Sequence, residues 1–75
     1  MYIRPAPGTS GDRCLDLFSP VPGWAQRYLE LVGIPVPQAR GALVSYRVPM
    51  SAIGPVRAFF TDMLWMHVRE EGGVA

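Results

Sequence analysis

The chain has 75 residues, of which 49% are hydrophobic, and its seven arginines against six acidic residues give a net charge of +1. A chain this short buries a modest fraction of its surface, yet it is too apolar for a disordered segment, so we expect a partner or a second copy to complete its core. Its near-neutral charge, with arginines spread singly along the chain, argues against a nucleic-acid-binding surface.

The chain contains a single cysteine, Cys14, and a single histidine, His67. One cysteine excludes an internal disulfide. The sequence contains no stretch of about 18 apolar residues, so no membrane span is predicted. Residues 1–11 lack the apolar centre of a signal peptide, so we expect a protein that is cytosolic when made.

Residues 1–23 are predicted to form an arm rich in proline and glycine. Within it, residues 2–4 are compatible with a short strand, and residues 14–18 alternate as a strand does, although a helix fits so short a run equally well. Pro-x-Pro begins at Pro5 and recurs at Pro20 and Pro35. Each pair should stiffen a connector between elements, because proline restricts φ. The intervening segments share no residue pattern, which excludes an internal repeat.

A short helix is predicted over residues 24–33, with Gly33 as its C-terminal stop. Its apolar residues share one side: Trp24, Tyr28, Leu31 and Val32. Residues 34–37 should be extended, because a residue that precedes proline is disfavoured in the helical region. A strand is predicted over residues 41–48, where apolar residues alternate with others until Pro49 ends it.

The longest predicted element is an amphipathic helix over residues 55–71. Pro55 suits the first position of a helix, and glycines at 72 and 73 would end it. Its expected buried face comprises Val56, Phe59, Phe60, Met63, Leu64 and His67. The sequence therefore predicts one small α+β domain over residues 1–75, with two or three short strands, a short middle helix and a longer C-terminal helix, joined by Pro-x-Pro connectors.

No catalytic residue, metal site or cofactor site is predicted. Cys14 and His67 are a nucleophile and a base in principle, but their spacing favours a packed histidine over a catalytic pair. One cysteine, one histidine and scattered acids do not supply the three or four ligands of a metal site. The turn at residues 8–11 lacks the lysine of a phosphate-binding loop.

Trp65 is the most informative side chain in the sequence. On the predicted helix it points away from the apolar face, so it is either covered by residues 2–7 or serves as an interface anchor. Tryptophan and arginine are the residue types enriched at binding hot spots. The predicted protein interface comprises Trp65, Arg69, Arg57, Asp62 and Trp24.

The N-terminal half also carries a resemblance. The run YIRPAPG at residues 2–8, Arg13-Cys14, and Val21-Pro22 followed by Trp24 and RYL at residues 27–29 resemble short proteins of unknown function that Mu-like phages encode beside the tail-sheath gene. The resemblance covers about residues 2–32. It implies a phage origin and a gene of the tail region.

These observations lead to two functional interpretations. The first is a small non-enzymatic bacteriophage protein, a tail-region or capsid-associated component of the virion that docks on larger virion proteins or on itself. Such a protein would be made in the host cytoplasm and then reside in the virion. The alternative is a phage-encoded inhibitor or regulator that binds a single host protein.

Overall fold

The computed structural model describes residues 1–8 and 11–71. Within these residues there are five strands: β1 (Tyr2–Pro5), β2 (Arg13–Leu17), β3 (Ile34–Val36), β4 (Val44–Val48) and β5 (Arg69–Glu70). Helix α1 spans Gly23–Val32, and helix α2 spans Met50–Ala58. A π-helical turn, η1 (Phe59–Met63), continues α2 without a break. No helix in the described residues is both long enough and apolar enough to cross a membrane.

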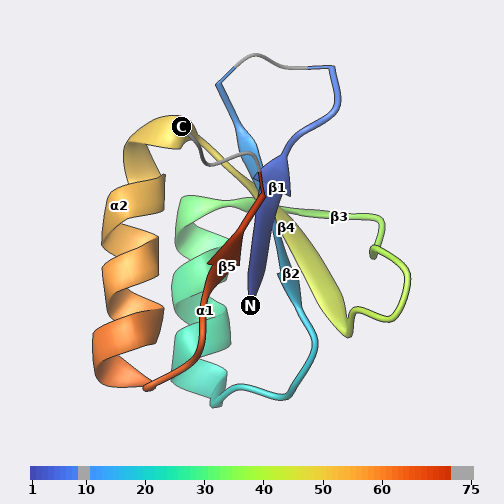
Figure 1. The fold of residues 1–75 in the computed structure, drawn as a ribbon. Coiled ribbons are helices and arrows are strands. Elements are labelled where there is room, and N and C mark those ends of the chain that lie inside the picture. The colour runs from blue at the N-terminus through green and yellow to red at the C-terminus, as the bar shows by residue number, and fades with distance from the viewer. Residues whose placement is uncertain (9–10, 72–75) are drawn as a thin grey trace.

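The five strands form one mixed sheet in the order β3-β4-β2-β1-β5. Neighbouring strands are antiparallel, except β1 and β5, which are parallel. The two helices lie side by side, run in opposite directions and cover one face of the sheet (Figure 1). The structure is therefore a two-layer α+β arrangement.

The predicted fold class is wrong in its balance of strands and helices. The sheet has five strands instead of two or three, and the described residues hold no helix over 55–71. The helix begins earlier, at Met50, because the extended backbone of Pro49 (φ −65°, ψ 151°) makes it the N-cap residue. Pro55 therefore lies inside the helix. Its missing N–H leaves the carbonyl of Ser51 without a helical donor, and both residues are exposed, so water can bind that carbonyl.

The helix also ends earlier than predicted. Leu64 is the C-cap residue (φ −108°, ψ −5°), and Trp65, the next residue, adopts a left-handed backbone with φ 55°. Across this turn the N–H of Met66 donates a hydrogen bond to the carbonyl of Phe60 at 2.9 Å. A left-handed residue just beyond the last turn is a common way to end a helix. The chain then turns back along the sheet and forms β5.

From Leu64 to Arg69, half-buried and exposed side chains alternate along the chain. Three half-buried apolar side chains pack against the core, namely Leu64, Met66 and Val68. The residues between them and after them are exposed, namely Trp65, His67 and Arg69. This period of two leads into β5, and a helical periodicity applied to the whole run does not reveal it.

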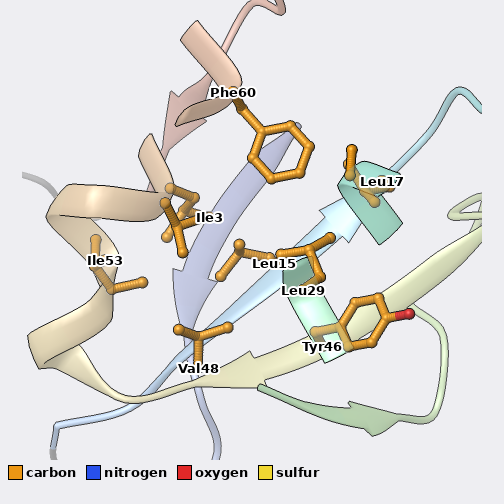
Figure 2. Close-up of a cluster of buried hydrophobic side chains, with 10 residues drawn as sticks. Ile3, Leu15, Leu17, Leu29, Tyr46, Val48, Ile53 and Phe60 are labelled. Carbon is orange, nitrogen blue, oxygen red and sulfur yellow. The ribbon is translucent and has the colours of Figure 1, made fainter. Parts of the chain in front are cut away.

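The hydrophobic core lies between the helices and the sheet. One row of it crosses three strands, because Ile3 is paired with Leu15 and Leu15 with Tyr46. Figure 2 shows these side chains facing Leu29 from α1 and Phe60 from η1. The buried cluster comprises Ile3, Leu15, Leu17, Ala25, Leu29, Tyr46, Val48, Ile53, Val56 and Phe60.

The buried faces of the two helices differ from their apolar stripes. In α1 the buried residues are Ala25 and Leu29, whereas Trp24 and Leu31, which belong to the apolar side predicted from the sequence, are exposed by 53% and 81%. In the second helix, Val56 and Phe60 are buried as predicted, but Met63 is 63% exposed and His67 is also exposed. A π-helical turn contains more residues than an α-helical turn, so positions after Phe60 rotate out of the α-helical stripe.

The predicted arm, residues 1–23, is not an arm, since it contains β1 and β2, two of the three inner strands. The Pro-x-Pro segments are also more than connectors. Pro5 is the last residue of β1, and Pro22 is the N-cap of α1. Pro35 lies within β3, at one edge of the sheet. Proline has no N–H to donate, and an edge strand tolerates this because it has a neighbouring strand on one side only.

The short strand β5 is attached to β1 by backbone and side-chain hydrogen bonds. The N–H of Arg69 donates to the carbonyl of Met1 at 2.9 Å, and the N–H of Glu71 donates to the carbonyl of Ile3 at 2.7 Å. The hydroxyl of Tyr2 donates to Oε1 of Glu71 at 2.7 Å. This hydrogen bond raises the pKa of Tyr2 above its ordinary value of 10.0, because ionisation removes the donor beside a carboxylate.

We expect Tyr2→Phe to destabilise the protein at neutral pH, and the difference from the wild type to vanish in alkali. A raised pKa in the folded state means that the stabilisation is fully present below the unfolded pKa of 10.0 and is lost as pH rises through the folded pKa. Urea unfolding of both proteins from about pH 8 to about pH 11 measures this difference. A difference that stays constant over this range would show that the hydroxyl does not hold β5.

Candidate docking surface

An aromatic cluster joins the two helices on their outer side. Phe59 of η1 packs on Tyr28 of α1 with ring centroids 4.3 Å apart, and edge-on against Trp24 at 5.7 Å. Phe59 also meets the buried ring of Phe60 at 5.3 Å, so the cluster is continuous with the core. Rings at these distances stabilise one another by more than the burial of their apolar surface alone. These contacts hold Trp24 in place, although half of its surface faces solvent.

A shallow hollow lies along α1 beside this cluster. Its volume is about 400 Å³, and it is lined by Gly23, Trp24, Arg27, Tyr28 and Leu31. Further large apolar side chains are exposed elsewhere on the described surface, namely Phe18, Ile34, Leu43, Met50, Met63 and Trp65. Single exposed apolar residues are ordinary, but so many on so small a domain favour a surface that is covered by another protein.

Trp65 is the most exposed of these side chains, with 89% of its surface accessible to solvent. Among the described residues it is also the only non-glycine residue with a positive φ, at 55°. A residue with a Cβ in the left-handed region costs roughly 1–2 kcal/mol, which glycine at the same position avoids. The fold therefore places a large apolar ring in solvent at a position where glycine would be the more stable choice.

The residues of the predicted interface lie on different elements. Trp65 is in the turn after η1, and Asp62 is exposed within η1. Arg57 of α2 forms an ion pair with Glu70 of β5 at 2.8 Å. Arg69 is on β5, so it does not follow Trp65 on a helix as the sequence suggested.

Trp24, the last residue of the predicted interface, contacts Phe59, which precedes Asp62 on the same π-helical turn. The start of α1 and the end of η1 lie at the same end of the helical layer (Figure 1). Trp24 and Asp62 therefore belong to this end of the molecule, whereas Arg69 lines a separate pocket with Met1 and Phe18.

The face of the sheet opposite the helices carries a buried polar network centred on Asp16. Its side chain accepts a hydrogen bond from Nε of Arg4 at 2.7 Å and another from the hydroxyl of Ser45 at 2.7 Å. The hydroxyl of Ser45 in turn accepts from the N–H of Ala39 at 3.2 Å. The hydrogen bond to Asp16 raises the pKa of Arg4, so its guanidinium stays charged.

This network is missed by the sequence prediction, although Asp16 stands alone in an apolar run of strand residues. In the described residues no buried side-chain nitrogen or oxygen lacks a partner. A satisfied network of this kind has a structural explanation, since it holds β1, β2 and β4 in register and ties the loop after β3 to the sheet.

Cys14 and His67 are not brought together. The buried thiol of Cys14 lies between Arg4 and Arg47 on neighbouring strands, at a hollow of about 280 Å³ on the open face of the sheet. His67 instead lines the pocket that contains Tyr2 and Arg69. Residues 1–8 and 11–71 contain no group of three or more histidine, cysteine or acidic side chains positioned to hold a metal ion.

Comparison with family models, with curated proteins and with solved structures finds no match to this chain. The chemistry and geometry of its own surface are therefore the basis for a functional interpretation.

Proposed function

We propose that the chain is a small non-enzymatic docking protein that binds a larger protein through Trp65. The observation that carries this proposal is the combination of an 89% exposed indole and a left-handed backbone at the same residue. Strained backbone conformations concentrate at functional sites, because selection for stability alone removes them. Burial of the exposed ring against a partner would offset the strain.

Trp65 has suitable neighbours for an interface. Met63, two residues earlier, is also exposed, and Asp62 adds a charge beside it. Hot spots combine a central aromatic anchor with surrounding residues that exclude water on binding. The hydrogen bond from Met66 to Phe60 holds the tight turn that carries the ring, so little backbone conformational entropy is lost when the ring enters a pocket.

The biological setting that we propose is a bacteriophage virion, with the chain as a tail-region or capsid-associated component. The resemblance of residues 2–32 to short proteins encoded beside the tail-sheath gene of Mu-like phages supports this setting. Mass spectrometry of purified particles tests it directly. A fixed copy number in particles is expected, whereas presence in infected cells and absence from particles would favour an inhibitor of a host protein.

Trp65→Gly should weaken binding to the partner while stabilising the isolated protein. We expect the free energy of unfolding to rise by about 1 kcal/mol, since glycine relieves the left-handed strain and the lost ring is exposed. Loss of the anchor should reduce binding by about 2 kcal/mol or more. Thermal unfolding and incorporation into particles, or pull-down of the partner, measure the two effects side by side.

Trp65→Ala, measured in the same experiment, separates the effect of backbone strain from the effect of losing the ring's contact with the partner. Alanine removes the ring but keeps the Cβ, so it should weaken binding as glycine does without the gain in stability. If both variants bind as the wild type does, Trp65 is not the anchor. If both variants unfold, the ring belongs to the core and the interface lies elsewhere.

A further inference from the structure

Strand β5 is attached to the rest of the molecule through a small surface. Its residues Arg69 and Glu70 pair only with β1, opposite Tyr2 and Ile3. Both residues of β5 are exposed, and the ion pair from Arg57 to Glu70 is partly accessible to solvent on both sides, so water weakens it. The segment that contains β5 can therefore leave the sheet at a smaller cost in free energy than an inner strand can.

The turn that connects this segment to the helical layer is strained. Trp65 holds a φ of 55°, a conformation that lowers the population of the turn roughly fivefold to thirtyfold for a residue with a Cβ. A hydrogen bond from Met66 to Phe60 spans the turn. An extended backbone at Trp65 would remove the strain, but it would carry residues 66–71 away from β1 of the same copy.

The edge of β1 is complementary to this segment. The carbonyls of Met1 and Ile3 accept backbone hydrogen bonds from the segment, and the core beside them packs against Met66 and Val68. When the segment leaves, these acceptors and this apolar surface become exposed together. A strand that adds to such an edge must supply backbone donors and apolar side chains with the same alternation. A second copy of this chain supplies both with the same residues.

We propose that two copies of this chain exchange residues 66–71, so that β5 of each copy pairs with β1 of the other. The register stays the same, with Arg69 of one copy opposite Tyr2 of the other. The turn opens at Trp65 in both copies and loses its strain. Exchange of an identical element is a low-cost route to a dimer, and a short strained hinge favours it. This interface uses β1 and β5 and not the indole ring, so it goes beyond the docking function proposed above.

The strain at the turn sets the strength of the dimer. A segment that closes on its own chain through a short linker has an effective concentration on the order of millimolar. Loss of the strain in both copies strengthens the exchanged form by a factor of roughly 30 or more. We therefore expect a dissociation constant on the order of tens of micromolar or below. Sedimentation equilibrium of the full chain over a series of concentrations measures this constant.

Substitutions of Trp65 test the role of the turn. Trp65→Gly should weaken the dimer at least about tenfold, because glycine adopts the left-handed conformation without strain in the closed monomer. Trp65→Ala keeps the Cβ and the strain, so its dissociation constant should stay within about threefold of the wild type. Both variants lack the ring and should bind the partner weakly, whereas only the glycine variant should lose the dimer. A glycine variant that dimerises as the wild type does would contradict the exchange.

Cross-linking shows which copy each strand pairs with. Tyr2→Cys/Arg69→Cys, made together with Cys14→Ala, places two thiols at directly paired positions of β1 and β5, close enough for a disulfide. After oxidation well above the dissociation constant, this protein should run as a covalent dimer on a denaturing gel without reductant. Ile34→Cys/Arg47→Cys is the matched control, because β3 and β4 pair within one copy and their disulfide should leave monomers.

Circular dichroism of each variant establishes that it is folded. A covalent dimer from the β1–β5 pair, together with monomers from the control pair, supports the exchange. A wild type that remains monomeric at the highest concentration, or a β1–β5 disulfide that forms within one copy of the dimer, would overturn the proposal.

Discussion

Replacing Phe60 with alanine should lower the free energy of unfolding by about 3 to 4 kcal/mol. The ring is fully buried and points from η1 into the cluster formed by Ile3, Leu15 and Leu17 (Figure 2). Removing the ring leaves a cavity between the helical layer and the sheet. The closely packed neighbours cannot fill this cavity unless the helices and the sheet both move. A loss of this size approaches the whole stability of so small a domain. Urea unfolding, monitored by circular dichroism, measures it.

Phe59→Ala is the matched control, since it removes the same ring from the next residue. The sequence prediction gave the two phenylalanines equal weight, but Phe59 is only half-buried and contacts Trp24 and Tyr28 at the outer side of the helices. We expect the free energy of unfolding to fall by about 1 to 2 kcal/mol. This loss comes from buried apolar area and ring contacts, since no closed cavity is left behind. Equal losses for the two variants would contradict the burial of Phe60 described here.

Asp16→Asn should lower the free energy of unfolding by about 2 to 3 kcal/mol, although the side chain keeps its shape. Asp16 is 1% exposed and accepts two hydrogen bonds from Arg4 as well as one from Ser45. The amide leaves the charge of Arg4 without its counterion, and its NH₂ group cannot accept any of these hydrogen bonds. The same urea measurement applies.

Arg47→Met is the control for this prediction, because Arg47 makes an ion pair on the same face of the sheet. That pair, to Asp12 at 3.1 Å, is partly exposed to solvent on both sides, so its loss should change stability by less than about 1 kcal/mol. Arg4→Met, by contrast, leaves the buried carboxylate of Asp16 without its counterion. Its loss of stability should therefore be similar to that of Asp16→Asn. Equal small effects for Arg4→Met and Arg47→Met would show that burial does not strengthen the Asp16 network.

The two helices show where periodicity alone misleads. In α1 apolar residues lie on both sides, and the stripe found by periodicity contains the larger ones, including Trp24 and Leu31. The structure buries Ala25 and Leu29 instead, so the two large side chains remain on the outside. In the C-terminal part, helical periodicity predicts a helix that continues to residue 71. The turn that ends the real helix carries no glycine, because Trp65 occupies its left-handed position.

What the sequence by itself determined is local. The alternation from Val44 to Val48 places Tyr46 and Val48 on one face of a strand, and the stiff backbone at Pro35 gives an extended segment. Only the tertiary structure decided which apolar side of α1 faces the sheet, that β5 returns to pair with β1, and that Asp16 is buried with Arg4. Each of these depends on contacts between residues far apart in the chain. Such contacts outweigh local propensities of a few tenths of a kcal/mol per residue, which is why short segments of this chain fit more than one structure.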